Sequence, residues 1–441
     1  MQGPALLIIF VLSIGVILLA IIKWKINPFI VLPTVGILTG LAAGLPIAKV
    51  TKLLSDGFGS TLGSIGIMVA LGIMLGKILA HAGATEQIAR LFIRKVGSGN
   101  MVMALAITGY VVCIPVFLTA AFIVFMPLVR DLARKGNISL VALTTSLTLA
   151  GSATHCIVIP TPAPIAVMGN LHLDVSRFLF WGLIVAIPPS MVGFLLAKVF
   201  AKQSFMTIDA SKFNDEVIDE SKPMPSGGLS LFVLLLPIVL ILIGSLMAEF
   251  LPKDHPMNSI FSFIGDKNIA MLVGLGVAAL VLRKYFSSSF ESLISSGGAD
   301  AGLLILIVGA GGAFGAIING SGIADQIVKL LSAWHLSLVW TGFLLTAILR
   351  AAQGSSTVAC VTVSSLMAPM LVSAPTENPV MIGLAICCGS ICLSMPNDSG
   401  FWVISRYSGL TVPQNLRMLT LGSAIIGVMG FIMVLILNSI L

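Results

Sequence analysis

Residues 151–164 read GSATHCIVIPTPAP and lie inside a long apolar run. Proline lacks a backbone N–H and breaks a helix, and an unpaired backbone group is costly in hydrocarbon. Such a break is tolerated in a membrane only where protein groups or a water-filled cavity satisfy the backbone. The stretch is therefore either a defective span or a component of a binding site, and this choice governs the interpretation of the whole chain.

The composition is that of a polytopic membrane protein. Of the 441 residues, 57% are hydrophobic and 9% are charged, whereas an ordinary soluble domain has about 25% charged residues. The formal net charge is +7, but the basic residues lie mainly in short loops between apolar segments, as membrane orientation requires. No interleaving of basic and aromatic residues indicates a nucleic-acid partner.

The six cysteines fall in apolar segments and form no paired CxxC clusters. This pattern favours small core residues over a zinc site or a disulfide framework. We therefore expect neither a metal nor a cofactor.

The chain contains twelve hydrophobic segments of roughly the length needed to cross a bilayer. The polar stretch 202–228 divides them six and six. The segments lie near residues 4–23, 27–46, 61–82, 101–129, 139–169, 177–200, 229–250, 268–286, 299–319, 338–371, 380–404 and 418–440.

The two halves of the chain are related in sequence. GIMLGKILAHAGATEQIARL (72–91) aligns without gaps with GGAFGAIINGSGIADQIVKL (311–330). GSATHCIVIP (151–160) corresponds to GSICLSMP (389–396) with a small gap. Shared membrane composition is the alternative explanation, but the aligned polar residues favour a duplication.

Segments 101–129 and 338–371 are too long for one simple span and are interrupted near their middles, which suggests re-entrant hairpins. If all twelve segments cross, the loop Lys and Arg residues divide eleven to eleven. With two hairpins and the N-terminus outside, they divide sixteen inside and six outside, as the positive-inside rule requires. Each half then crosses five times, so the second repeat must be inverted, a recurring design of secondary transporters.

The predicted fold is therefore an all-α polytopic membrane protein of two inverted repeats, each with five spans, a re-entrant hairpin and a broken helix. The two breaks and the two hairpin turns, CIPVFLTAAF (113–122) and LRAAQGSSTVA (349–359), should meet near the membrane centre. Half-helix N-termini there would offer N–H groups and partial positive charge to an anion.

Hydroxyl, amide and guanidinium groups of these four stretches are the predicted substrate ligands, although Ser, Thr and Gly also serve close helix packing. The candidates are Thr119, Ser152, Thr154, Thr161, Arg350, Gly354, Ser355, Ser356, Thr357, Asn397 and Ser399.

Three ionisable side chains in these stretches each have two interpretations. Arg350 can clamp a carboxylate, or it can pair with Asp398 or a helix C-terminus. Asp398, the one acid within the breaks, is a candidate proton carrier and also a suitable N-cap. His155 is a second candidate for proton coupling, or a satisfied core imidazole.

Three stretches resemble the gluconate:proton symporter family of bacterial permeases, the GntP-type gluconate permeases. They are GFGSTLGSIGIMVALGIMLGKILAHAGATEQIA (57–89), LRAAQGSSTVA (349–359) and MPNDSGFWV (395–403). The resemblance covers nearly the whole chain. It implies proton-coupled uptake of gluconate or a related small hydroxylated anion across the bacterial inner membrane, and it implies no enzymatic activity.

The resemblance also implies a scaffold and a mobile transport domain, often in a dimer, so a homodimer is expected. In this chain the first repeat would comprise residues 1–201, with its scaffold region at 1–96 and its transport region at 101–201. The cytoplasmic linker would comprise 202–228. The second repeat would comprise 229–441, with its scaffold region at 229–335 and its transport region at 338–441.

One departure leaves the substrate open. The family often has a PPTPGP-like sequence after its histidine, whereas this chain has IPTPAP (159–164). Glycerate and D-serine are therefore alternatives to gluconate, and sodium is an alternative to the proton. A channel, which needs a continuous pore, and an intramembrane enzyme are the rival classes. The chain has no GxxxxGK[ST] loop, which disfavours an ATP-driven pump, and no HExxH.

Overall fold

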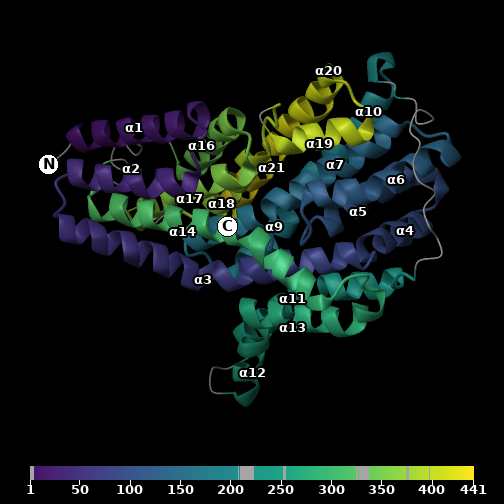
Figure 1. Ribbon diagram of the computed structural model, residues 1–441, viewed down its shortest axis with the longest axis horizontal. Coiled ribbons are helices and arrows are strands. Elements are labelled where there is room, and N and C mark those ends of the chain that lie inside the picture. The colour runs from purple at the N-terminus through teal and green to yellow at the C-terminus, as the bar shows by residue number, and fades with distance from the viewer. Residues whose placement is uncertain are drawn as a thin grey trace.

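The computed structural model describes residues 4–206, 208, 223–251, 255–323, 326, 337–373, 377–396 and 398–441. All regular secondary structure in these ranges is helical (Figure 1), which confirms the all-α fold. Most of the predicted linker 202–228 lies outside the described residues, as does most of the second aligned stretch after residue 323.

The helices of the first half match the predicted segments, except that α3 begins at Ile47 rather than near residue 61 and that α4 is an addition between two segments. They are α1 Pro4–Leu18, the π-helix η1 Leu19–Lys23, α2 Pro28–Ala42, α3 Ile47–His81, α4 Ala84–Val96, η2 Ser98–Asn100, α5 Met101–Val112, α6 Leu118–Gly136, α7 Leu140–Ile157, α8 Pro162–Asn170, α9 Val175–Val185, α10 Ile187–Ala201 and η3 Ser204–Met206.

The second half repeats this pattern, with α12 as an addition. Its helices are α11 Gly227–Phe250, α12 Pro256–Gly265, α13 Lys267–Leu282, η5 Arg283–Tyr285, α14 Phe290–Gly320, α16 Leu338–Gln353, α17 Ser356–Ser373, α18 Pro379–Ile391, α19 Ser399–Ser408, α20 Val412–Asn415, the π-helix η6 Leu416–Leu421 and α21 Gly422–Ile440.

Both predicted hairpins are helix–turn–helix units, α5–α6 and α16–α17, and both predicted breaks separate two helices, α7–α8 and α18–α19. Six helical segments of the described residues are long and apolar enough to cross a membrane, and α3, which bends by 44°, makes a seventh. The predicted ten crossings exceed this number because several predicted spans consist of shorter apolar helices. The inverted orientation of the second repeat stays a prediction.

The two broken helices form the centre of the molecule. Every residue of α7 except His155 is buried, and all of α8 is buried. In α18, residues 381–391 are likewise buried throughout. Their many Ala, Gly, Ser and Thr residues allow neighbouring helices to approach closely, as expected where packing rather than water exclusion drives association.

Two groups of helices surround this centre. The long helices α3 and α14 pack along each other and against α2, and Lys77 of α3 pairs with Asp300 of α14 at 2.6 Å. The other group contains both hairpins, α17 included, and both broken helices, α8 included; in it α7 lies between α5 and α10, and α18 between α16 and α21. In Figure 1 the hairpin α5–α6 lies in the right half of the view and α16–α17 in the left half.

Glycines of α3 and α14 lie where the two groups meet. A Cβ added at Gly72 or Gly76 would lie 3.0 Å from the carbonyl oxygen of Pro160 or 2.5 Å from that of Pro115. The aligned glycines of α14, Gly311 and Gly315, both face Ser365 of α17. Bare backbone at all four positions is therefore required for close approach to a hairpin or a break.

We expect Gly76→Ala to lower the free energy of unfolding by about 1–3 kcal/mol, because the added methyl group overlaps a carbonyl oxygen that cannot easily move. Gly63→Ala, in the same helix, is the control, since nothing lies within 4 Å of the added Cβ. Unfolding of purified protein in mixed micelles gives both values. Equal stability of the two variants would contradict the close contact.

Candidate functional site

The two breaks and the turn of each hairpin converge on one cavity of about 200 Å³. Its wall is mainly hydroxyl-bearing, with one guanidinium, one carboxylate and one imidazole. The polar lining residues are Thr119, Ser152, His155, Arg350, Ser355, Ser356, Thr357, Ser390, Ser394, Asp398 and Ser423.

The first break, between α7 and α8, is closed by a threonine. Thr161 donates its hydroxyl proton to carbonyl oxygens at the end of α7, with contacts of 2.7 Å to His155 and 2.6 Å to Val158. Pro162 follows at the first position of α8, where its missing N–H leaves no helical hydrogen bond unmade. Thr161 therefore satisfies backbone groups that the break exposes.

The second break, between α18 and α19, is satisfied by the last transmembrane helix. The backbone N–H of Ser394 donates to Ser423 Oγ at 3.1 Å, and Thr420 Oγ1 donates to the Ser394 carbonyl. Thr420 lies in the π-helical turn η6, an irregularity that often marks functional sites. Leu393 adopts a left-handed conformation with φ 56°, which is unfavourable for a leucine and locates backbone strain at this break.

Three helices begin at the cavity. Leu118 and Thr119 open α6, Ser356 and Thr357 open α17, and Gly400 lies in the first turn of α19. The partial positive charge of each helix terminus therefore faces the same space, although at α19 the Asp398 carboxylate already accepts from the Gly400 N–H. Together the three termini favour a negatively charged ligand.

Arg350 and Asp398 form an ion pair in the wall of the cavity. Their Nη2 and Oδ2 atoms are 2.5 Å apart, and the two side chains are only 7% and 18% exposed. Asp398 also accepts from Ser394 Oγ at 2.6 Å and, as the N-cap of α19, from the Gly400 N–H at 2.8 Å. The Nε and Nη1 atoms of Arg350 are buried and have no partner.

An arginine with two unpartnered buried donors is costly unless a ligand accepts from it. A carboxylate entering this cavity could accept hydrogen bonds from Nε and Nη1 of Arg350, while Nη2 stays paired with Asp398. The structure shows Arg350 paired with Asp398, and its role as a carboxylate clamp stays a prediction.

His155 also faces the cavity. Its ring contacts Phe117 with 5.5 Å between ring centroids, and its Nδ1 atom is buried without a partner. Cys156, the next residue, lines the same cavity. The imidazole therefore retains a hydrogen-bonding atom that a substrate or a proton could use.

Most predicted site residues come together here. The cavity contains Thr119, Ser152, His155, Arg350, Gly354, Ser355, Ser356, Thr357 and Asp398.

Thr154 and Thr161 do not line the cavity. Their hydroxyls bond to backbone carbonyls, that of Thr154 to Gly109, Ala150 and Gly151. Ser399 is the first residue of α19, directly after the cap. Asn397 lies outside the described residues.

The prediction missed several polar lining residues, notably Ser390, Ser394 and Ser423. The first two lie in GSICLSMP, the stretch already aligned with the first break, so the alignment could have identified them. Ser423 had no such signal, because its segment reads as an uninterrupted span. Only its long-range contact with Ser394 brings it to the cavity.

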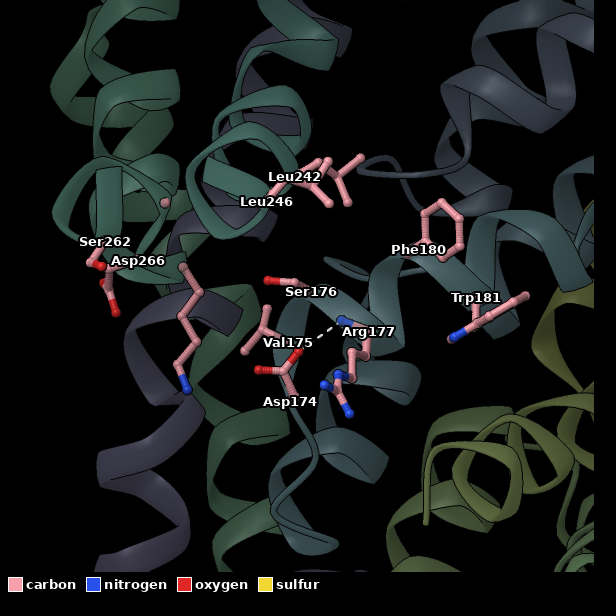
Figure 2. A pocket seen from close by; sticks show the side chains of 12 residues that line it. Asp174, Val175, Ser176, Arg177, Phe180, Trp181, Leu242, Leu246, Ser262 and Asp266 are labelled. Atoms are coloured by element: carbon pink, nitrogen blue, oxygen red, sulfur yellow. Dashed lines mark hydrogen bonds between the residues drawn. The ribbon is translucent and has the colours of Figure 1, made fainter. Parts of the chain in front are cut away.

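A larger groove of about 720 Å³ lies elsewhere, between α9 and the helices α11–α13 (Figure 2). Its acids cap helices: Asp174 accepts from the Arg177 N–H at 2.8 Å, and Asp266 accepts from the Asn268 N–H at 2.9 Å. Figure 2 shows Ser262 and Asp266 on the wall opposite Phe180 and Trp181, without a convergent set of polar groups. The smaller cavity is therefore the candidate site.

Within the described portion of the chain, no group of three or more His, Cys, Asp or Glu residues is arranged to hold a metal ion. All six cysteines are buried and free. The chemistry of the cavity therefore comes from hydroxyls, helix N-termini, His155 and the Arg350–Asp398 pair.

Apolar helices broken around a polar central cavity define a multi-pass membrane transporter. The chain belongs to the GntP permease family, whose sequence model it matches over residues 5–440. It is 33% identical to the inner membrane permease YgbN of Escherichia coli K12, with 98% of each chain covered. It is 32% identical to a gluconate permease of Pseudomonas aeruginosa, over 97% of this chain and 96% of that one.

A solved structure, the YdaH transporter of Alcanivorax borkumensis, has a similar fold with a TM-score of 0.66. The match covers 88% of this chain and 89% of that one at 16% sequence identity, so it supports the fold alone. The family and these relatives are permeases and transporters, and the protein is not an enzyme.

We expect Thr161→Val to lower the free energy of unfolding by about 1–3 kcal/mol, since it removes the hydroxyl that two buried carbonyl oxygens accept from. Thr357→Val is the matched control, because the same isosteric change falls on a residue of the cavity wall. Unfolding in mixed micelles without substrate compares the two. A loss of stability in the control but not in Thr161→Val would overturn the assignment of Thr161 to the break.

Proposed function

We propose that the protein carries gluconate, or a closely related small hydroxy-carboxylate, across the inner membrane by proton symport. The observation that supports the substrate class is the cavity, in which Arg350 has unpartnered donors and three helix N-termini converge. The surrounding hydroxyls suit a polyhydroxylated chain, since a hydroxyl can accept from the substrate even where its own proton is donated within the protein, as at Ser152 and Ser394. The gluconate permease name among the relatives points to the same substrate class.

The division of labour follows from this chemistry. Arg350 and the N-termini of α6 and α17 bind the carboxylate. Ser355, Ser356 and Thr357 at one side, and Thr119 and Ser152 at the other, bind the hydroxyl groups. Asp398 holds Arg350 in place between substrates.

The helices divide into a scaffold and a moving transport domain. The scaffold consists of residues 1–96 and 229–335, which contain the mutually packed α3 and α14. The transport domain consists of residues 101–201 and 338–441, which contain both hairpins and both broken helices. Every described lining residue of the cavity belongs to the transport domain, so the substrate would travel with it. The expected homodimer would join two scaffolds.

Gluconate should raise the thermal stability of the purified protein, by about 2.7 kcal/mol at 100 times its Kd. Sorbitol, which has the hydroxyls but no carboxylate, should not. Glycerate and D-serine complete the panel and test the alternative substrates. Counterflow of labelled substrate in proteoliposomes then separates a carrier from a channel.

Arg350→Lys should weaken gluconate binding by about 1.5–3 kcal/mol, because an ammonium group keeps the charge but loses the additional donors of the guanidinium. Arg177→Lys, in the larger groove, is the control and should bind normally. Unchanged gluconate affinity in a folded Arg350→Lys protein would remove the cavity as the binding site.

Proton coupling is assigned to Asp398, with His155 as the second candidate. Among the described residues that line the cavity, Asp398 is the one acid, and it is paired with Arg350, the group proposed to bind the substrate carboxylate. Arrival of a substrate carboxylate at Arg350 would weaken the hold of the guanidinium on Asp398, so proton uptake there can be linked to binding.

Asp398→Asn should therefore retain exchange of labelled substrate across proteoliposomes and lose accumulation driven by an imposed pH gradient. His155→Gln is compared in the same assay. If Asp398→Asn still concentrates substrate against its gradient, Asp398 is not the coupling group. If both variants do so, neither side chain is the coupling group. If the unsubstituted protein does not accumulate substrate under a pH gradient, sodium becomes the coupling ion to test.

A further inference from the structure

A second polar pocket, of about 300 Å³, lies where the two groups of helices meet. It is formed by residues of α3, α14, α17 and the end of α8, and it shares no lining residue with the substrate cavity. Helix α17 connects the two: its first residues line the substrate cavity, and its residues 365–372 contribute to the second pocket.

The second pocket lies beside helix C-termini, whereas the substrate cavity lies beside helix N-termini. Asn170 is the last residue of α8, Asn319 lies in the last turn of α14, and Val372 lies in the last turn of α17. Helix C-termini expose carbonyl oxygens and carry partial negative charge. The partial negative charge of these ends favours a cation, and at the end of α14 the Lys49 ammonium group already donates to the Gly320 carbonyl at 3.5 Å.

Asn170 supplies a buried acceptor without a partner. The residue is 4% exposed, and its Nδ2 donates to Ser364 Oγ at 2.9 Å and Ser365 Oγ at 3.0 Å. Both serines donate their own protons to the Val361 carbonyl, so the amide nitrogen must face them. The Oδ1 atom then remains buried with no hydrogen-bond donor.

The remaining lining groups also offer oxygen. Asp56 supplies a carboxylate and Thr61, which is 4% exposed, a hydroxyl. None of the described residues that line this pocket is Lys or Arg, and His172 is the one other titratable group. A single carboxylate with neutral oxygens suits a hard monovalent cation, whereas divalent and transition-metal sites gather more charge or nitrogen and sulfur ligands.

We propose that this pocket binds a monovalent alkali cation, with Asp56, Thr61 and Asn170 contributing oxygen ligands. Because α3 and α14 supply one wall and α8 and α17 the other, the cation would join the two groups of helices in the arrangement seen here. Its effect on transport rests on the proposed function: the bound cation stabilises one position of the transport domain. This role is separate from the proton exchange assigned to Asp398.

The test measures thermal unfolding of the purified full-length protein in NaCl, KCl, LiCl or choline chloride at constant ionic strength. We expect at least one alkali cation to raise the unfolding temperature in a saturable manner relative to choline. Asp56→Asn should abolish this rise, and Thr61→Val should weaken it. Asp56 is exposed, so its loss is compatible with folding. Glu291→Gln, which neutralises another exposed acid at the start of α14, should leave the rise intact.

Two outcomes would overturn the site: equal unfolding temperatures in all four salts, or a cation effect that persists in Asp56→Asn. Gluconate, added as its choline salt, provides the independent arm. A gluconate shift without a cation effect removes only the cation site. A cation effect that Asp56→Asn abolishes, without a gluconate shift, supports the cation site and removes the proposed substrate.

Discussion

A helix that ends inside a membrane leaves backbone carbonyl and N–H groups without partners, and no water is available to replace them. The centre of this protein is organised by that constraint. At the first break Thr161 donates to two carbonyl oxygens, and at the second Ser423 and Thr420 bond to both backbone groups of Ser394. The N-termini of α6, α17 and α19 are left to face a cavity, so the same interruptions that threaten stability create the anion site.

The ion pair of Arg350 and Asp398 makes that site compatible with its surroundings. An isolated guanidinium buried at this depth would be strongly destabilising. Pairing with Asp398 offsets the cost, and the hydrogen bonds from Ser394 and Gly400 hold the carboxylate in place. Only a portion of the guanidinium is used in this way, since Nε and Nη1 stay unpartnered. The pair thus keeps a buried charge stable while reserving donors for a ligand.

The sequence was informative where structure is set locally. Proline and glycine located both breaks and both hairpin turns, and most of the residues singled out at those positions did meet in one cavity. It was uninformative where a position depends on distant contacts: Ser423 reaches the cavity only through Ser394. It was also ambiguous where one side chain serves two purposes. A threonine hydroxyl at a break suits a substrate or a carbonyl oxygen equally well, and Thr161 bonds to the carbonyls.

Helix α3 shows a further limit of hydropathy. The helix begins at Ile47, well before the predicted span at 61–82. Its first turns contain Lys49, Lys52 and Asp56, so a search for apolar runs does not detect them. Asp56 lines the second pocket. The polar residues that hid the start of this helix are therefore among those that make its surface chemically useful.

The aligned residues Gly76 and Gly315 indicate how far the transport domain would move in the proposed motion. Gly76 faces Pro115 in the turn of the first hairpin, but Gly315 faces Ser365, nine residues beyond the start of α17 at Ser356. At about 1.5 Å per residue this offset is roughly 14 Å along the helix. If the two repeats are equivalent, the proposed motion would produce a second arrangement in which the turn of the second hairpin reaches Gly315 and Pro115 leaves Gly76.

The glycines at positions 76 and 315 would then serve the same purpose, because each would leave room for a hairpin turn in one of the two arrangements. The second pocket exists only while the far end of α17 lies beside α14. A cation bound there would therefore favour the arrangement seen here over the alternative.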